Sequence, residues 1–545
     1  MRTLALILLG ALTGCGSTRP CKGGTVFVTV TLDGAARAAT NVEVDIQTDA
    51  GDHRSGIFAV RSVGAGSVEI DFPAGYPEGQ TVTVRVNALQ GAGTIATGRA
   101  TFTAAPGCSA VAVGIGDDDG GGGCDPTGVE DRCSADRKSV LVCRADGSGF
   151  DTQQCHSTCG DTGAPAHCLE LQPSGSADLT DYSGTANVTL SADTVFDTDS
   201  GAITGGFTRP AGAGAMAGVG FRSISQPGST VRIGVFGFAG LTVAQGATIT
   251  LAGKSPLAIV SSADVLIAGT LNLQGDCNLP PTGGGGTGGR SDVNNGDGLG
   301  TRGGRSGGGA ANAASGGGGG GGGDNGGRGG NSGATAGGAG GVAYGDLTTE
   351  PLLLVGGSGG GAGGAGMAPT TGGFGGNGGG AVQIAVDGAL KVSGMLHAGG
   401  CGGRAGAAQA GGGGGGSGGA ILLEAITIDL AATATLATNG GGGGGGDAGG
   451  AGGNGGPNAN FATAGTAANA GTAGGSGGAT GRLTGANGAD GAAKNCGGGG
   501  GASGRIALKT AAGTITDEGS TLSPTANDRT AAMQPVLTVG RAAFE

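Results

Sequence analysis

Two serines stand in the pattern of a hydrolase nucleophile, Ser358 within 356–360 and Ser417 within 415–419. A serine flanked by glycines in this way attacks an acyl carbon when a histidine and an acid activate it on a strand-turn-helix scaffold. His397 is the only histidine after residue 167, and a glycine tract produces the pattern by chance. The sequence therefore predicts no catalytic serine.

Phosphate and calcium motifs are also incomplete. Gly253-Lys254-Ser255 resembles the end of a phosphate loop, but Thr248 stands where that loop needs a glycine. Asp324 and Asp447 lack the large apolar residue that follows the aspartate in calcium-binding repeats. We expect no bound metal and no cofactor.

Four carboxylates lie on apolar strand patterns and are the best-placed candidates for glycan cleavage. A lyase or glycosidase needs clustered carboxylates and aromatic platforms for the sugar rings. Aromatic residues are scarce after residue 241, so we interpret the carboxylates as solvent-facing strand residues and predict no catalytic residue. A carbohydrate-active β-helix enzyme remains the alternative function. The carboxylates are Asp264, Asp387, Glu424 and Asp429.

The N-terminus carries an export pattern. Arg2 precedes the apolar run 4–12, and Leu12-Thr13-Gly14-Cys15 resembles the lipobox of bacterial lipoproteins. The resemblance implies cleavage before Cys15 and acylation of that residue, including palmitate-type chains, which anchor a protein stably when more than one is present. An ordinary signal peptide with an accidental cysteine is the other interpretation.

Export favours disulfides among the remaining cysteines. Cys21 and Cys108 bracket alternating strand patterns at 26–30, 42–46, 68–72 and 81–86. Such alternation predicts an immunoglobulin-like β-sandwich of about seven strands. We expect Cys21–Cys108 to join its first and last strands.

After an acidic and glycine-rich linker at 117–123, six cysteines are concentrated in a short segment. This density predicts a small disulfide-stapled module, because so small a core does not fold without covalent support. His156 and His167 raise zinc binding as an alternative, but no CxxC pair is present. The spacing leaves the pairing open among Cys124, Cys133, Cys143, Cys155, Cys159 and Cys168.

The rest of the chain is dominated by glycine. The 545 residues include 138 Gly, no Trp and 3% aromatic residues, and the glycines are concentrated between 271 and 510. The net charge of −12 repels phosphate backbones, so we exclude nucleic acid as a partner.

Between the glycine tracts, a unit of short apolar strands recurs with starts near 257, 381, 420 and 505. Short strands joined by glycine turns and repeated with long insertions predict a right-handed parallel β-helix-like solenoid. Insertions of such unequal length must loop out from one edge of the stack.

The register of this repeat predicts a disulfide. Cys277 and Cys401 each follow a strand by the same offset, and equivalent positions of successive coils stack about 4.8 Å apart. That spacing suits a disulfide, so we expect Cys277–Cys401, with Cys496 as the odd thiol. A Cys401–Cys496 bond is the rival pairing.

The glycine tracts themselves allow two interpretations. Either they are disordered, or their backbones bond to one another, because extended chains without Cβ atoms can pack closely. The uncharged tracts 316–323 and 411–416 do not have the charge that is usual in disordered segments. Collagen is excluded, because the chain has no strict third-residue period and only 17 Pro.

The segments 231–236, 340–345 and 415–424 resemble a group of uncharacterised glycine-rich surface lipoproteins of myxobacteria and their relatives. The similarity spans about 180–525, and it implies surface exposure without implying an activity.

Together these features predict a mostly β, non-enzymatic protein of the outer membrane or cell surface of a Gram-negative bacterium. We expect a structural or adhesive role, a lipid anchor in the membrane, and a surface glycan or protein as partner. A flat glycine array that binds ice or mineral is a third possibility. The expected parts are the signal peptide 1–14, the sandwich 21–116, the linker 117–123, the cysteine-rich module 124–170, the glycine-rich β-helix-like domain 180–525 and a C-terminal tail 526–545.

Overall fold

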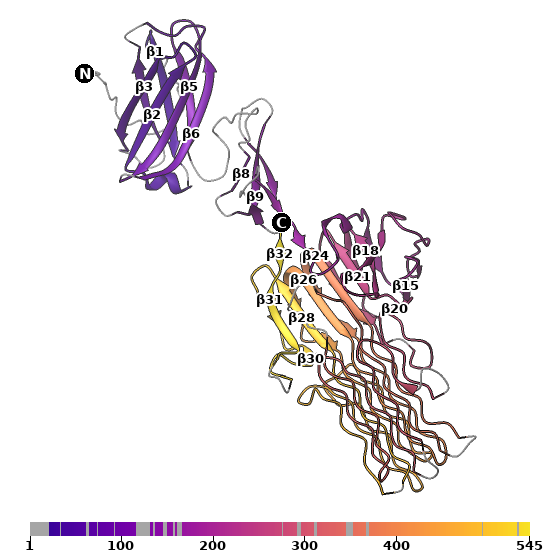
Figure 1. Ribbon diagram of the computed structural model, residues 1–545. Coiled ribbons are helices and arrows are strands. Elements are labelled where there is room, and N and C mark those ends of the chain that lie inside the picture. The colour runs from indigo at the N-terminus through magenta and orange to yellow at the C-terminus, as the bar shows by residue number, and fades with distance from the viewer. Residues whose placement is uncertain are drawn as a thin grey trace. The chain divides into compact units, whose positions relative to one another are not determined.

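The structure is a computed structural model, and the protein is mostly β (Figure 1). Its contacts divide the chain into two units, Met1–Leu169 and Glu170–Glu545, which we describe separately. The predicted signal peptide, Cys15, the linker, Cys124 and His156 lie outside the described residues. The structure describes residues 21–545 except 33, 61–64, 73–74, 92, 116–130, 135–136, 145–149, 156–157, 161–165, 275, 292–295, 310–312, 345–351, 367–369, 493 and 531–533.

The first part of the N-terminal unit contains two sheets around one core. The sheets have the strand orders β4-β1-β7 and β3-β2-β5-β6, and alternating valines and isoleucines from both sheets are buried between them. The Cys21–Cys108 disulfide is present, with a Cα–Cα distance of 5.9 Å. The strands are β1 (Thr25–Leu32), β2 (Asn41–Thr48), β3 (His53–Ala59), β4 (Ala65–Asp71), β5 (Thr81–Gln90), β6 (Gly93–Thr103) and β7 (Ser109–Ile115).

The second part of this unit is a small module stapled by disulfides. Cys133 is bonded to Cys159 and Cys155 to Cys168, and Cys143 is also disulfide-bonded. His167 is exposed on β12, and no group of three or more metal-ligating residues occurs anywhere in the described part of the chain. The strands are β8 (Arg132–Cys133), β9 (Ser139–Cys143), β10 (Phe150–Gln154), β11 (Thr158–Gly160) and β12 (His167–Leu169).

The second unit begins with two sheets of mainly parallel strands that face each other across an apolar core. Here we call this part the solenoid. One sheet contains β14 (Asn187–Leu190), β17 (Gly220–Ser225), β18 (Arg232–Phe238), β19 (Gly240–Val243), β21 (Leu257–Ser261), β22 (Val265–Ile267), β24 (Ala381–Val392), β26 (Ala420–Leu430), β28 (Arg505–Thr510), β29 (Thr516–Asp517) and β31 (Leu537–Arg541). The other contains β15 (Thr194–Asp197), β16 (Ile203–Gly205), β20 (Thr248–Ala252), β23 (Thr270–Asn272), β25 (Met395–His397), β27 (Thr435–Ala437) and β30 (Thr521–Ser523).

The predicted strand repeat has the predicted order. Ile259, Ile384, Leu423 and Leu508 occupy one ladder across β21, β24, β26 and β28, and all four are fully buried. The repeat also begins earlier than the sequence indicated, because β14 to β20 already form stacked strands before residue 257.

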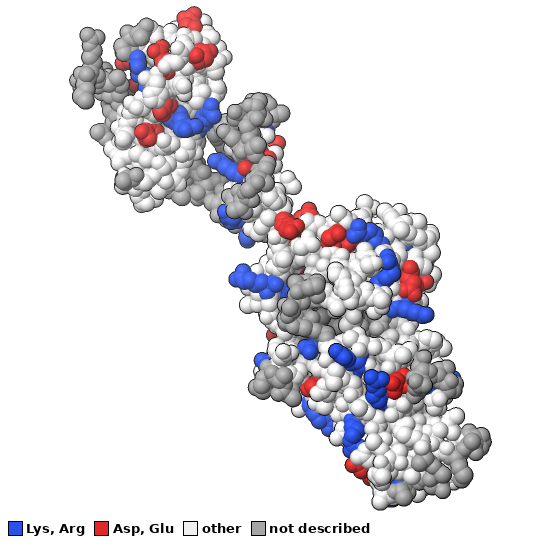
Figure 2. Space-filling view, in the orientation of Figure 1, with Lys and Arg blue, Asp and Glu red and all other residues white. Residues whose placement is uncertain are grey.

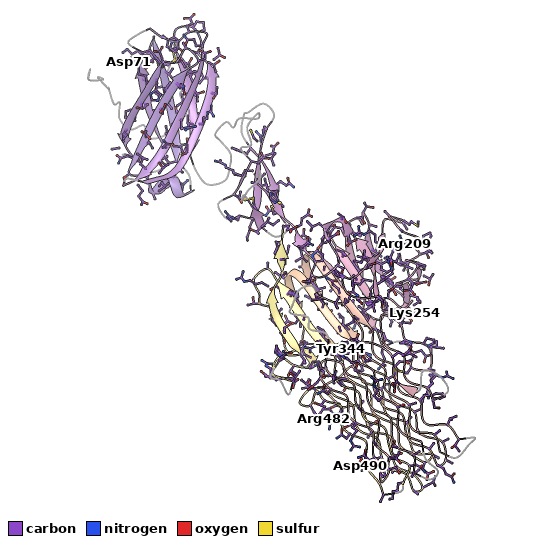
Figure 3. All side chains as sticks on the ribbon, viewed as in Figure 1. Asp71, Arg209, Lys254, Tyr344, Arg482 and Asp490 are labelled. Carbon is purple, nitrogen blue, oxygen red and sulfur yellow. A yellow bond between two sulfur atoms is a disulfide. The ribbon has the colours of Figure 1, made fainter. Side chains whose placement is uncertain are left out.

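Antiparallel strands and a buried arginine lie beside the first parallel strands of the two sheets. β16 and β17 pair antiparallel with β15 and β18. Arg209 is 1% exposed, and its guanidinium donates to five backbone carbonyls of the adjoining loops, among them those of Gly201 and Val219. Figure 3 shows Arg209 in the solenoid, away from Arg482 and Asp490.

The expected boundaries of the last domain are wrong at both ends. Residues 526–545 are not a tail, since β31 pairs with β28 and β32 (Ala543–Phe544) pairs with β13 (Leu171–Gln172). The segment 170–182, which includes β13 and the short 3-10 helix η2 (Leu179–Asp181), also belongs to this unit. Alternation of apolar residues alone could not reveal these pairings, because each involves only a few residues.

Candidate functional site

The glycine tracts leave the solenoid directly from its strands. Glycines 380, 419 and 504 lead into β24, β26 and β28, and the chain leaves again after β25 and β27. The tracts therefore continue the strands side by side, and Figure 1 shows them as a long body of aligned chains without strand arrows. We call this body the glycine bundle: residues 283–290, 296–309, 313–344, 355–366, 370–380, 398–419, 438–456, 461–491 and 495–504.

Successive residues of an inner tract bond to different neighbours, and the pattern repeats every third residue. Gly316 and Gly319 donate to 330 and 327, and Gly317 and Gly320 donate to 412 and 415. Their N···O distances are 2.8–3.0 Å. A period of three residues is that of the polyproline II helix, whose backbone groups point outward in three directions.

The carbonyls of the same tract accept from three further segments, so that it has neighbours on all sides. The carbonyls of 316, 317 and 318 accept the N–H groups of 338, 499 and 361. The bundle interior is therefore a lattice of backbone hydrogen bonds rather than a sheet. The segments around 316–321 are 302–305, 324–330, 338–341, 358–364, 412–415 and 497–502.

Close packing explains the glycines. A Cβ at Gly316 or Gly319 would lie 1.9 Å from the carbonyl oxygen of Gly497 or Gly500, and one at Gly317 or Gly320 would lie 2.2 Å from another carbonyl oxygen. Such contacts cannot be relieved by a rotamer change, because the clashing atoms are backbone on both sides. Of the two alternatives for the tracts, the structure has the bonded one.

Outer segments keep a side chain at every third position. Ala336, Ala339 and Val342 are exposed along one such segment, whereas Gly338 and Gly341 between them are buried. Most of the visible bundle surface is uncharged (Figure 2). This local Gly-Gly-X spacing is the sequence signal of the bundle, and it does not extend along the whole chain as a strict period.

Asparagine and aspartate side chains complete the outer hydrogen bonds. An outer segment lacks a neighbour on its solvent side, so some of its N–H groups have no carbonyl partner. The N–H groups of Gly288, Arg328 and Gly402 instead donate to the side chains of Asn377, Asn487 and Asn454, at 2.9 Å each. These asparagines have a structural role that was not predicted from the sequence, because their residue type alone does not indicate it.

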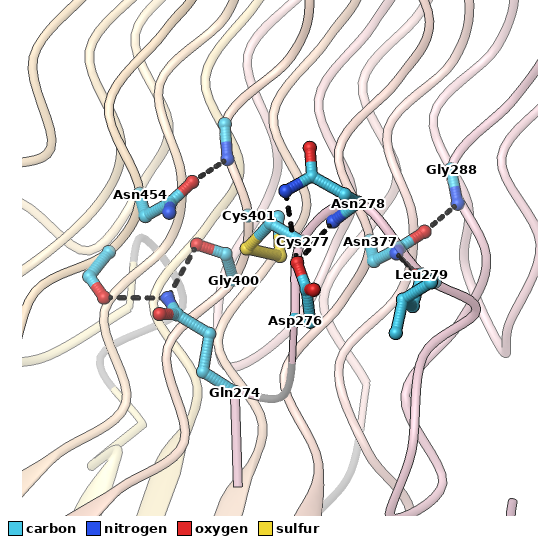
Figure 4. Close-up of a disulfide and its surroundings, with 12 residues drawn as sticks. Gln274, Asp276, Cys277, Asn278, Leu279, Gly288, Asn377, Gly400, Cys401 and Asn454 are labelled. Carbon is cyan, nitrogen blue, oxygen red and sulfur yellow. Dashed lines mark hydrogen bonds between the residues drawn. A yellow bond between two sulfur atoms is a disulfide. The ribbon is translucent and has the colours of Figure 1, made fainter. Parts of the chain in front are cut away.

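The Cys277–Cys401 disulfide ties one face of the bundle to the loop after β23. The predicted bond is present with a Cα–Cα distance of 5.5 Å, although the register of β23 with β25 aligns Cys277 with Gly402, one residue beyond Cys401. Cys496 is free and buried. Figure 4 shows the surrounding bonds, in which Gln274 donates to the carbonyl of Gly400 and Asn377 donates to that of Leu279.

The two serines of the hydrolase pattern are both fully buried where the bundle meets the solenoid. The N–H of Ser358 donates to Ser417 Oγ at 2.8 Å, and the hydroxyl of Ser358 donates to Tyr344 Oη at 3.0 Å. Burial raises the pKa of Tyr344 to about 12, so its hydroxyl stays protonated and donates to the carbonyl of Gly356. These hydroxyl groups therefore form part of the hydrogen-bond network of the bundle.

The lone histidine of this unit lies on the same boundary. His397 Nε2 is 2.8 Å from the carbonyl oxygen of Gly455, and burial lowers the pKa of the imidazole. Its bond joins β25 to the bundle, and among the described residues the imidazole makes no hydrogen bond to either serine.

The interpretation of the carboxylates as solvent-facing is wrong for Glu424, which is 0% exposed. Its carboxylate lies 3.7 Å from Lys509 Nζ and accepts from Gln383 and Ser174. Asp264 is exposed and accepts the N–H of Ala389. Asp387 accepts the N–H of Leu171. Period-two alternation cannot reveal that a segment far away in the sequence covers Glu424.

Among the described residues, no helix is long and apolar enough to cross a membrane. Comparisons of the chain with protein-family models, with curated proteins and with solved structures find no match.

Proposed function

We propose that this chain is a non-catalytic cell-surface lipoprotein, anchored through Cys15, that displays the glycine bundle in a structural or adhesive role. In finer terms, we propose an immunoglobulin-like sandwich, a cysteine-rich module and a right-handed β-helix-like solenoid that carries the bundle.

The bonded interior of the bundle is the observation that carries this proposal. Inner tracts such as 316–321 bond to neighbours on all sides and leave no space for a Cβ atom. Substrate and catalytic side chains therefore find no room inside, whereas the regular outer side chains form an extended contact surface. An extended surface with many weak contacts suits adhesion, because linked contacts raise the effective concentration of each other.

The proposal is tested by measuring the adhesion of cells that display a variant in which only the bundle is disrupted. Cells would display the wild-type chain, Gly319→Ala or the control Gly540→Ala, since a Cβ at Gly540 meets nothing within 4 Å. Surface amounts would be matched with an antibody to residues 21–115. We expect Gly319→Ala to reduce retention under flow on glycan-coated surfaces and on other cells, and the control to retain it.

Equal retention by all three strains would contradict the adhesive role. Polysaccharide turnover by the purified protein, abolished by Asp or Glu substitution, would replace it with the enzymatic alternative. The anchor has its own test, since Cys15→Ser is expected to release the protein from the membrane fraction.

A second candidate, ice or mineral binding, is favoured by one face of the bundle. Ala448, Ala451, Thr463 and Thr466 are exposed on two adjacent segments, which bond through 450 to 466 and 453 to 463. Small side chains at a three-residue spacing repeat about every 9 Å along a polyproline II helix. Thermal hysteresis of the wild type that Thr463→Lys abolishes would favour this function, and its absence would remove it.

A further inference from the structure

A buried polar cluster lies where the segment 170–182 crosses the outer face of the solenoid. Three neighbouring strands contribute to it: Gln383 from β24, Glu424 from β26 and Lys509 from β28. Glu424 is directly opposite Lys509 in the strand register. Ser174, from the crossing segment, is the fourth member.

One carboxylate joins the hydroxyl and the amide in this cluster. Ser174 Oγ donates to Glu424 Oε1, and Gln383 Nε2 donates to Glu424 Oε2 at 2.8 Å. The same amide nitrogen donates to the carbonyl of Ser174 at 2.9 Å. Lys509 Nζ donates to Ser174 Oγ at 2.6 Å. Gln383 is 1% exposed and Glu424 0%, so water has little access to the amide.

We propose that Ser174 and Gln383 join in an intramolecular ester, made by the folded chain with Glu424 as the general base. A buried carboxylate needs hydrogen-bond donors, and here the donors of Glu424 are a hydroxyl nucleophile and a carboxamide that could react with each other. This arrangement suits an acyl transfer, because one group must take a proton from the nucleophile and give one to the leaving nitrogen.

The step balances without a co-reactant. Ser174 Oγ attacks the amide carbon of Gln383 while its proton passes to Glu424 Oε1, and Lys509 stabilises the negative charge that develops at the reacting oxygens. The carbon–nitrogen bond then breaks, and the Glu424 carboxyl group gives this proton to the departing nitrogen beside it. Ammonia leaves, an ester remains, and Glu424 is a carboxylate again.

Ser174 is a better nucleophile here than Lys509. Glu424 lies on the strand between Gln383 and Lys509, so the lysine faces the carboxylate. An ammonium that donates its protons to Ser174 and Glu424 has no free electron pair. The serine hydroxyl contacts the base directly.

The ester would hold the start of the second unit to the centre of the solenoid. Without it, the chain enters this unit through β13, a two-residue strand that pairs only with β32 among the described strands. A covalent bond from Ser174 to β24 would carry a pulling force past that short pairing. This inference does not depend on the proposed adhesive function.

Peptide mapping of the full-length protein tests the ester. The denatured protein would be digested below neutral pH and analysed by mass spectrometry. We expect one peptide that joins the regions around 174 and 383, lighter by one ammonia than the two separate peptides. Hydroxylamine should separate it, since esters react with hydroxylamine under conditions that leave amides intact.

Variants assign the roles. Ser174→Ala and Glu424→Gln should each yield only the separate peptides, whereas Ser176→Ala, a neighbour whose hydroxyl has no partner, should keep the link. Separate peptides with an intact Gln383 amide in the wild type would overturn the proposal, even if a variant failed to fold. A link that maps to Lys509 or resists hydroxylamine would overturn the assignment to Ser174.

Discussion

The strands of the solenoid continue directly into the tracts of the glycine bundle, yet different interactions stabilise the two regions. In the solenoid, strands pair within two sheets, and buried leucine, isoleucine and valine side chains fill the space between the sheets. In the bundle, inner tracts such as 316–323 consist of glycine alone and are held by backbone hydrogen bonds to neighbours on all sides. The extended chain passes from the bundle into the solenoid at Gly380, Gly419 and Gly504, after which apolar side chains begin.

The comparison shows why the bundle needs the solenoid. Ordering a residue costs about 1–2 kcal/mol of backbone entropy, and glycine is at the upper end. One net backbone hydrogen bond contributes about 0.5–1.5 kcal/mol. An array of glycines alone is therefore marginal, whereas buried side chains stabilise the solenoid strands that hold several tract ends in register.

The largest effect is expected from adding one methyl group inside the bundle. Gly319→Ala places a Cβ 1.9 Å from the carbonyl oxygen of Gly500, so the lattice must open there. We expect a loss of more than about 4 kcal/mol for the cooperative unit that contains the tract. Hydrogen exchange measures this, with Gly540→Ala as the control. Unchanged protection of the bundle amides would contradict the packing described above.

Removing the Cys277–Cys401 bond tests how far a crosslink supports the bundle. The bonded residues are 124 apart in sequence, and chain entropy gives such a crosslink about 4–5 kcal/mol. The Cys277→Ser, Cys401→Ser double variant should unfold at lower denaturant concentration, while the N-terminal unit should be unaffected. A peptide that links 401 to 496 in the wild type would show that the strand register is wrong.

A core substitution in the solenoid tests whether the stability of the bundle depends on that of the solenoid. Leu423→Ala removes a fully buried side chain from β26 and should cost about 2–5 kcal/mol. Because β26 continues the tract 410–419, bundle amides should lose protection together with those of the solenoid. Loss confined to the solenoid would show that the bundle is stable by itself.

A smaller loss of stability is expected when an asparagine that bonds to outer backbone groups is removed. Asn377→Ala leaves the N–H of Gly288 and the carbonyl of Leu279 without their partner, which should cost about 1–3 kcal/mol. Thermal unfolding measures this against Asn460→Ala, an exposed asparagine just before the bundle segment 461–491. Equal stability of both variants would mean that water replaces the asparagine.

The smallest effect concerns pH at the boundary of the two regions. Burial lowers the pKa of His397 in the folded protein, so the unfolded chain binds the proton more tightly. Stability contributed by the neutral imidazole is therefore present above the unfolded pKa of about 6.5 and falls below it, by at most about 1.4 kcal/mol per pH unit. Denaturant titrations at pH 8 and pH 5 should show a smaller loss for His397→Gln than for the wild type.

Many strand positions and two disulfides, Cys21–Cys108 and Cys277–Cys401, could be predicted from the sequence, whereas the pairing inside the cysteine-rich module could not. Alternating residues at 26–30 and 42–46 form strands, because one face of each must be buried. Matching the strands before Cys277 and Cys401 predicted their bond, although the observed register aligns Cys277 with Gly402, so the loops after the strands take up a difference of one residue.

Only the tertiary structure decided what the glycines do. Glycine restricts its own backbone little, so no local preference distinguishes a disordered tract from a bonded one. The choice depends on whether neighbouring tracts arrive in register on every side, and the solenoid strands set that register. The burial of Glu424 was decided in the same way, because the residue that covers it, Ser174, comes from a distant part of the sequence.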